Sequence, residues 1–270
     1  MMLADLPLAR RLERAEGCAC AGFVETRAKF NPATGAEWIE VAGTYAMFDG
    51  PRSPVTQTFG LGIFEPPRVA DLDKIESFFF ERGAPVSHEV SPLSDRATMP
   101  LLCVRGYQPI EFSSVMFLPL AGRAMNTPSG RVTARRAGEA DLEIWAQTAA
   151  EGWQGLTGVD DVLRDLMRVA AAGRQELSFL AELEGRPVAA AALFVHDGVA
   201  LLAGASTIPD ARRQGAQAAL LEIRLRHAMG AGCDVAMMCA EPGSASQRNA
   251  ERQGFRIAYT RVKWRLDRSD

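Results

Sequence analysis

The second half of the chain alternates between two hydrophobic patterns, one typical of helices and one typical of strands. In residues 139–153 the apolar side chains of Leu142, Trp145 and Ala149 recur at helical spacing. Residues 199–208 form a short, almost wholly apolar run, as buried strands do. Across the second half the pattern predicts, in order, a strand, two helices, three strands, a helix, a strand, a helix and a final strand.

The first half repeats the organisation seen at the end of the second. Residues 83–120 and 230–266 each read as a strand ending near a proline, a helix, a glycine followed by an aromatic residue, and a long strand. Residues 37–50 and 55–64 look like a hairpin, and residues 71–83 like a helix. The chain therefore contains an internal repeat, which indicates two related folding units.

Small, turn-forming residues at 121–131 separate the two halves. We therefore predict a domain at 1–122, a linker at 123–131 and a second domain at 132–270. The mixture of strands and helices predicts the α/β class, with a central mixed sheet flanked by helices in each domain.

Composition narrows the class of protein. The chain has 270 residues, 47% of them hydrophobic, and a net charge of -3, so it can form a core and lacks the basic surplus typical of nucleic-acid binding. No apolar run of about 18 residues is present, which argues against a membrane span. The five cysteines and three histidines are scattered. We expect reduced thiols, no metal site and a cytoplasmic location.

Residues 208–221, IPDARRQGAQAALL, place unusual charge at a predicted helix start. Arg212 and Arg213 stand where acidic residues usually complement the helix dipole. A bound phosphate resolves the conflict, because the first N–H groups of a helix and arginine side chains both bind phosphate oxygens. Gly215 lets such an oxygen approach the backbone. A solvated loop of arginines is the alternative.

This stretch resembles the pyrophosphate loop of the GCN5-related N-acetyltransferase (GNAT) family, whose pattern is Q/R-x-x-G-x-G/A. Residues 212–217 fit it, except that Gln217 stands where Gly or Ala is usual. The similarity extends over roughly residues 132–266 through the order of strands and helices. The first half looks like a degenerate, truncated copy, because residues 64–79 contain no glycine–arginine loop. The resemblance thus implies two GNAT-like domains in tandem, one of them with a cofactor site.

The resemblance implies acetyl-CoA as the acyl donor. Its pyrophosphate would bind the backbone N–H groups of residues 213–218, and its pantetheine would pair with the end of the preceding strand like an added strand. In the following helix, Asn249 is favoured over Ser246 as a contact. The implied cofactor-binding residues are Ser206, Thr207, Ile208, Arg212, Arg213, Gln214, Gly215, Ala216, Gln217, Ala218 and Asn249.

The catalytic residues are less clearly marked. Family members often carry a tyrosine acid four residues before the final Gly-Phe pair, where this chain has Ala250. Tyr259 is the tyrosine nearest to that position in the sequence and is therefore the candidate acid. The alternative is that Tyr259 is only a half-buried aromatic residue of a strand. Glu241, which ends the strand at 233–241, is the candidate base; a water-mediated route is left open.

These features predict an N-acetyltransferase that moves an acetyl group from acetyl-CoA to the amine of a small molecule by direct transfer in a ternary complex. A protein acetyltransferase acting on a lysine or an N-terminus is one alternative. A non-catalytic acyl-CoA-binding regulatory module is another, supported by the missing tyrosine. Nucleic acid and membrane are not expected as partners, and a homodimer is left open.

Overall fold

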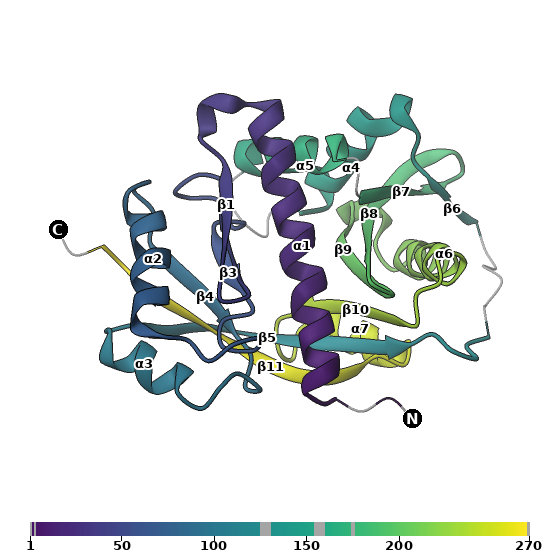
Figure 1. Ribbon diagram of the computed structural model, residues 1–270. Helices are drawn as coiled ribbons and strands as arrows, with labels where there is room; N and C mark the ends of the chain where they lie inside the picture. The colour runs from purple at the N-terminus through teal and green to yellow at the C-terminus, as the bar shows by residue number, and fades with distance from the viewer. Residues whose placement is uncertain (1, 3, 125–130, 154–159, 174–175, 269–270) are drawn as a thin grey trace. The chain divides into compact units, whose positions relative to one another are not determined.

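The computed structural model describes residues 2, 4–124, 131–153, 160–173 and 176–268. The chain divides into two compact units, Met1–Leu118 with Met237–Asp270, and Pro119–Ala236. Each unit contains a sheet and helices, so the expected α/β fold with mixed strands is confirmed (Figure 1). None of the helices in the described residues is long and apolar enough to cross a membrane.

The first unit combines the N-terminal half with the last strands of the chain. Its sheet has the order β1-β2-β3-β4-β11-β5-β10, with β3 and β4 parallel and β11 antiparallel to both of its neighbours. Its helices and strands are α1 (Leu6–Phe30), β1 (Glu37–Val41), β2 (Thr44–Phe48), β3 (Gln57–Phe59), α2 (Val69–Phe80), β4 (Val86–Val90), α3 (Thr98–Val104), β5 (Gln108–Pro119), β10 (Val235–Ala240), α7 (Ala245–Arg252) and β11 (Arg256–Leu266).

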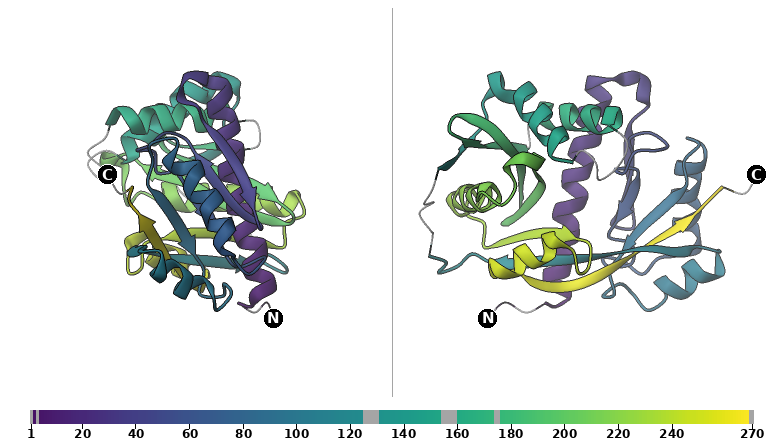
Figure 2. Two further views of the ribbon diagram at one scale, coloured as in Figure 1. Left: turned by 60° about the vertical axis from the view of Figure 1, so that its left-hand side comes forward. Right: turned by 180° about the vertical axis from the view of Figure 1, so that it is seen from behind.

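Strand β11 lies between β4 and β5, although more than 130 residues separate it from either in sequence (Figures 1 and 2). The two predicted repeats, β4–α3–β5 and β10–α7–β11, both form, and their strands interleave in the order β4-β11-β5-β10. The compact units therefore follow packing rather than sequence order. The expected domains 1–122 and 132–270 follow the repeat, and that division stays a prediction; residues 125–130 of the expected linker 123–131 lie outside the described part.

Helices cover both faces of the first unit's sheet, α1 one face and α2 with α3 the other. Strand alternation sends Tyr45 and Met47 of β2 to the core under α1, where Val24 packs. Ala46 and Phe48 point to the opposite core, which α2 and α3 complete. Helix α1 was not assigned from the sequence; its start is capped by the Asp5 carboxylate, which accepts a hydrogen bond from the third residue of the helix over 3.0 Å.

The second unit has an antiparallel sheet in the order β9-β8-β7-β6. One face packs against α4 through a core that includes Trp145, Ala149 and Leu180. Helix α6 packs on the other side of β7, where His227 meets the Phe179 ring edge-on at 5.0 Å. The elements are β6 (Val132–Arg136), α4 (Leu142–Trp153), α5 (Asp160–Ala172), β7 (Glu176–Leu183), β8 (Arg186–His196), β9 (Val199–Thr207) and α6 (Ala216–Gly230).

Candidate functional site

The N-terminal end of helix α6, in the second unit, has no side-chain cap. Its N-cap, Gly215, has a left-handed backbone with φ 93°, and no side chain caps the helix. The first turn holds no acidic residue, and Ala219 is the residue whose N–H donates to the N-cap carbonyl, over 3.0 Å. The N–H groups of residues 216–218 therefore have no acceptor within the helix, and this end is suited to an anion.

The loop before α6 turns sharply at two left-handed residues. Arg213 has φ 64°, a conformation uncommon outside glycine. Such strained residues cost of order 1–3 kcal/mol and cluster at functional sites. At Gly215 an added Cβ would meet no heavy atom within 4 Å. Glycine there serves the backbone conformation, and open space remains beside the helix start.

The two arginines of the loop lie differently. The Arg212 side chain turns back to the protein, donating from Nε to the Thr207 carbonyl over 3.3 Å and from Nη2 to the Gly152 carbonyl over 3.2 Å. It therefore ties the loop to the ends of β9 and α4. Arg213 is exposed, and within the described residues its side chain makes no hydrogen bond or ion pair. Arg213 is the arginine available to a phosphate.

The end of β9 is fixed to its surroundings through side chains. Ser206 donates from Oγ to the Ala149 carbonyl over 2.9 Å, and the Gln217 amide donates to Thr207 Oγ1 over 2.8 Å. Helix α4 approaches so closely at Gly152 that a Cβ there would lie 2.4 Å from Ser206 Oγ. These contacts position the strand end relative to the start of α6.

The backbone at this strand end offers pairing groups. Ile208 N–H donates to the Val188 carbonyl of β8 over 3.0 Å. In an antiparallel pair, residues alternate between bonding their partner and facing away from it, so the N–H and C=O of Thr207 face away from β8. The Thr207 carbonyl already accepts from Arg212 Nε, so the Thr207 N–H is the group with which an extended ligand could pair as an added strand does.

The corresponding helix of the first unit begins in a different way. At the start of α2 the Asp71 carboxylate accepts from the Arg68 backbone N–H over 3.1 Å and from the Arg68 guanidinium over 3.0 Å and 3.1 Å. The chain's own carboxylate thus neutralises the arginine at this helix start. This arrangement agrees with the interpretation of the N-terminal half as a copy without a pyrophosphate loop.

Three predicted site residues lie in the first unit. Glu241 is exposed directly after β10. Asn249 lies on α7, where its Oδ1 accepts from Arg252 over 2.8 Å. The N-cap of α7 is Ser244, whose Oγ accepts from the Gln247 N–H over 3.1 Å.

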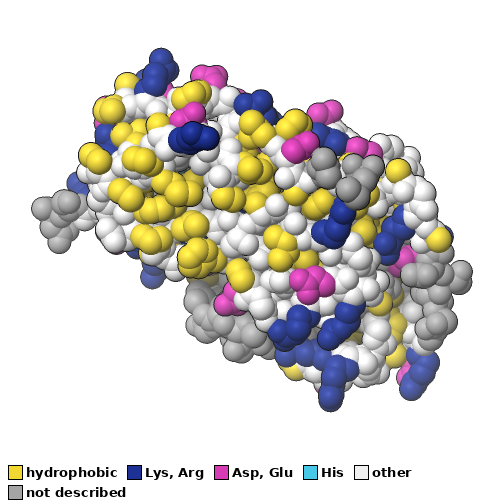
Figure 3. All heavy atoms as spheres, turned by 90° about the horizontal axis from the view of Figure 1, so that it is seen from below, with side chains coloured by type: hydrophobic (Ala, Val, Ile, Leu, Met, Phe, Trp, Pro, Cys, Tyr) yellow, Lys and Arg dark blue, Asp and Glu magenta, His cyan; other side chains and the backbone are white. Residues whose placement is uncertain are grey.

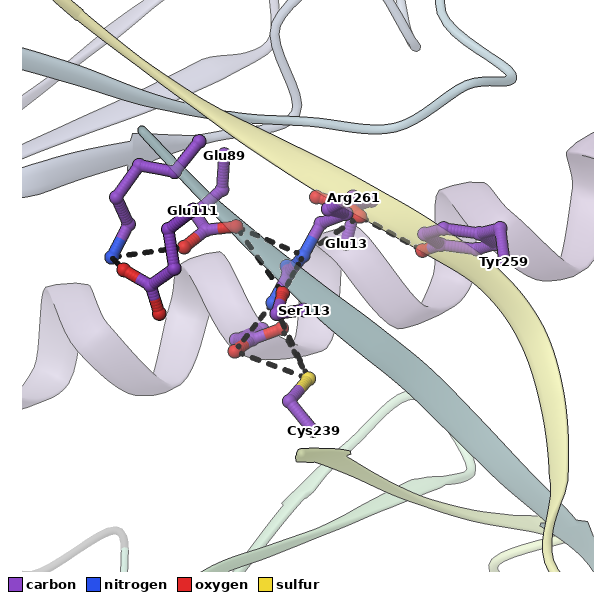
Figure 4. A network of polar contacts seen from close by, with 9 residues as sticks. Glu13, Glu89, Glu111, Ser113, Cys239, Tyr259 and Arg261 are labelled. Carbon is purple, nitrogen blue, oxygen red and sulfur yellow. Dashed lines mark hydrogen bonds and ion pairs between the residues drawn. The ribbon is translucent and has the colours of Figure 1, made fainter. Parts of the chain in front are cut away.

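Tyr259, the candidate acid, is buried in the first unit with 6% of its surface exposed. Its hydroxyl donates to Glu13 Oε1 of helix α1 over 2.8 Å (Figure 4). Burial raises the pKa of Tyr259 well above its ordinary value, and the charge of Glu13 adds to the rise. These surroundings favour the alternative interpretation of Tyr259, in which it is a buried aromatic residue of a strand and not the catalytic acid.

Tyr259 borders a buried cluster of charged groups. The Arg261 guanidinium, 2% exposed, lies 2.8 Å from Glu16, 3.4 Å from Glu89 and 3.6 Å from Glu13 (Figure 4). Burial raises the pKa of Glu13 from 4.5 to about 7, against the opposing attraction of Arg261. The cluster joins α1 to β11, and Glu13 Oε2 has no hydrogen-bond partner within the described residues.

The structure thus brings together only part of the predicted site. Residues 206–218 form one continuous segment of the second unit, exposed at residues 212–215, whereas Glu241, Asn249 and Tyr259 belong to the first unit. Among the described residues, no group of three or more His, Cys, Asp or Glu side chains could hold a metal ion.

Sequence reasoning missed Gly152 and Glu13. A glycine in the last turn of a predicted helix is a recognisable indication of close packing. Glu13 gave no such indication, because its partners lie far away in the chain.

Comparison with known proteins identifies the second half. The model of the acetyltransferase (GNAT) family matches residues 142–255, which include β9, the arginine loop and α6. No curated protein matches the sequence.

Solved structures share the fold over most of the chain. A GCN5-related N-acetyltransferase from Kribbella flavida has a TM-score of 0.66 at 18% identity, over 93% of this chain and 96% of that one. A GCN5-related N-acetyltransferase from Sphaerobacter thermophilus has a TM-score of 0.58 at 16% identity, over 86% and 75%. A tandem GNAT protein from the clavulanic acid biosynthesis pathway has a TM-score of 0.59 at 11% identity, over 84% and 79%.

Proposed function

We propose that the chain, whose residues 142–255 match the model of the acetyltransferase (GNAT) family, is an acyltransferase that takes an acetyl group from acetyl-CoA and transfers it to the amine of a small molecule. The transfer is direct, within a ternary complex of chain, donor and acceptor. The observation that supports this proposal most is the open start of α6, where unpaired N–H groups and an exposed arginine form an anion site.

The donor site consists of the loop before α6 and the end of β9. Backbone N–H groups from Arg213 to Ala218 hold the pyrophosphate, and the Arg213 guanidinium adds a charge-assisted contact. Arg212 keeps the loop in place through its two carbonyl contacts. Ser206, Thr207 and Ile208 receive the pantetheine, with the backbone N–H of Thr207 as its pairing partner. The rest of the proposed pyrophosphate loop consists of Gln214, Gly215, Ala216 and Gln217. Asn249 is a further proposed contact of the donor.

Acetyl transfer forms a bond between the acceptor nitrogen and the acyl carbon and breaks the carbon–sulfur bond of the thioester. The electron pair of that bond leaves on sulfur, and the amine gives its proton to a base. Neutralising a lysine-like amine at pH 7 costs about 4.6 kcal/mol, whereas holding two reactants in line supplies about 7–11 kcal/mol. We propose that positioning provides most of the acceleration, with exposed Glu241 or a water as the base.

The acceptor and the assembly are also proposals. The sequence contains no strongly acidic run that would mark a polycationic substrate, and a small amine is the acceptor we propose. A homodimer is supported by exposed apolar side chains on α3 and β5, namely Met99, Val104, Ile110 and Phe112. Figure 3 views the molecule from the side on which α3 and β5 lie in Figure 1, and hydrophobic side chains gather there. Cytoplasmic location stays a prediction.

The test is calorimetric titration with acetyl-CoA of the wild type and of Gly215→Glu. The new side chain would place bulk and negative charge at the anion site, so we expect binding to be lost. Gly232→Glu is the matched control, because Gly232 also has a positive φ (80°) with open space around it and lies at the other end of α6.

Loss of binding in Gly215→Glu alone supports the site, and an amine panel then identifies the acceptor. Undiminished affinity in that variant contradicts the site, and no binding to the wild type contradicts the proposed donor. Binding without turnover of any amine or of any lysine-containing peptide would favour the regulatory module.

A further inference from the structure

Helix α6 carries a buried arginine on the side that faces the sheet. Arg224 is 4% exposed, and all of its hydrogen bonds among the described residues run to backbone carbonyl groups. Its Nε donates to the Leu220 carbonyl over 3.1 Å, and its Nη1 lies 3.1 Å from the Ala192 carbonyl and 3.4 Å from the Ala203 carbonyl. Within the described part of the chain, no carboxylate pairs with this charge.

Two of the carbonyl groups that Arg224 binds, those of Ala192 and Ala203, lie next to an irregularity in the sheet. Between β8 and β9, Ala192 faces Ala203 and Ala190 faces Ser206, so one residue of β8 opposes two residues of β9. The extra residue makes a β-bulge at Gly204–Ala205, and Gly204 has the left-handed φ of 59° that glycine permits. A bulge leaves backbone groups of the ladder without strand partners, and these need other donors.

Buried donors from two helices satisfy carbonyl groups at the bulge. Trp145 of α4, 1% exposed, donates from Nε1 to the carbonyl of Ala191, the residue of β8 opposite the bulge, over 3.1 Å. Arg224 of α6 serves the carbonyls of the adjacent pair. Helices α4 and α6 therefore both stabilise the bulge through side-chain hydrogen bonds.

The bulge is also the accessible part of its strand. Residues 203–205 are half-buried, whereas residues 199–202 before them and 206–207 after them are buried. In the proposed donor site the phosphates lie at the start of α6 and the pantetheine follows residues 206–208. A ligand that continues along β9 away from the phosphates reaches residues 205 and 204 next.

We propose that Arg224 is a positioning residue for acyl transfer, which holds the Gly204–Ala205 bulge and places a fixed positive charge behind the backbone that receives the acyl group. This inference rests on the proposed function. Negative charge develops on the acyl oxygen and on the leaving sulfur as the carbon–sulfur bond breaks. A fixed charge in a buried setting stabilises it without reorganisation.

A packing role alone does not account for this residue. An arginine buried without a carboxylate is less favourable than an apolar side chain of similar volume, since its charge loses hydration. Burial lowers the pKa of Arg224 to about 10, which still leaves the side chain charged at pH 7. A leucine or methionine would fill the same volume at lower cost if no function required the charge.

The experiment replaces Arg224 by methionine, which keeps length and removes charge and donors. Thermal unfolding first establishes that Arg224→Met folds. We then expect kcat to fall about 10- to 100-fold while the calorimetric Kd for acetyl-CoA changes by less than about threefold. A second readout needs no acceptor: the thiol of bound CoA, followed by the ultraviolet absorbance of its thiolate, should have a pKa about one unit higher in the variant.

Arg226→Met is the matched control, because Arg226 lies two residues along the same helix with a side chain 46% exposed and an ion pair to Glu222. We expect kcat and the thiol pKa of this variant to match the wild type. If Arg224→Met does not fold, Arg224→Gln replaces it, because glutamine removes the charge and keeps a hydrogen-bond donor. The same two measurements, kcat and the thiol pKa of bound CoA, then test the inference.

An unchanged kcat and an unchanged thiol pKa in the Arg224 variant would overturn the inference. So would equal losses of kcat and of acetyl-CoA affinity, because they would indicate a merely structural role. A wild type that binds no acetyl-CoA would instead overturn the proposed function, and the inference with it.

Discussion

The buried cluster around Arg261 makes a quantitative prediction for Glu13. Its pKa is raised from 4.5 to about 7, mainly by burial. The groups that face it are Arg261, Glu16, Glu89 and the Tyr259 hydroxyl. The folded chain thus holds the Glu13 proton more tightly than the unfolded chain does. The stability that this proton contributes is complete below pH 4.5 and is lost as the pH rises through about 7.

The size of the effect follows from the shift. A difference of one pKa unit corresponds to 1.36 kcal/mol, so a rise from 4.5 to about 7 corresponds to about 3 kcal/mol. Glu13→Gln cannot titrate, yet its amide oxygen can still accept from Tyr259. The free energy of unfolding of Glu13→Gln, relative to the wild type, should therefore increase by about 3 kcal/mol between pH 4.5 and pH 8.

Urea unfolding of both proteins across this pH range measures the difference directly. Glu111→Gln is the control, because Glu111 pairs with Lys263 near the same cluster but has a side chain 54% exposed. Its pH dependence should follow that of the wild type. A difference between Glu13→Gln and the wild type that stays constant with pH would refute the reasoning, since Glu13 would then not change protonation within this range.

Two further predictions concern buried groups elsewhere. Burial lowers the pKa of His88 from 6.5 to about 3, so the wild type should lose stability as the pH falls from 6.5 towards 3, by up to about 1.4 kcal/mol per unit. His88→Gln should remove this part of the acid dependence in urea unfolding, and an unaltered slope would contradict it. Gly152→Ala should lower stability by about 1–3 kcal/mol and weaken acetyl-CoA binding, because the new Cβ would lie 2.9 Å from the Thr207 backbone nitrogen. Gly230→Ala, whose Cβ would meet nothing within 4 Å, should leave both the Tm and the Kd close to wild type.

The sequence predicts those parts of the molecule that depend on neighbours in the chain. The position of α6 and its glycine N-cap follow from residues 208–221, because a helix start is a local structure. The repeated strand–helix–strand segments follow for the same reason. Arg213 and Gly215 are thus recognisable from the sequence alone as candidates for the anion site.

Long-range pairing lies beyond such reasoning. Nothing local in residues 256–266 indicates that β11 pairs with β4 and β5. The partners of Tyr259 and Arg261 are equally hidden from the sequence, because Glu13 and Glu16 lie at the opposite end of the chain. Arg224 looks like an ordinary polar residue of a helix. Only the glycine within the predicted strand, Gly204, is a local indication of the bulge that Arg224 supports.

The place of β11 in the sheet has a consequence for the order in which the protein is made. A ribosome releases the first residues long before residue 266, so the sheet of the first unit lacks a central strand until residues 256–266 have been made. Strands β4 and β5 must wait as unpaired edges, which are the segments most prone to wrong pairing. Residues 119–236, which form the second unit, are continuous in sequence, so this unit can fold without residues 256–266. Nascent chains should therefore acquire the acyltransferase half of the molecule before the N-terminal half can close around its last strand.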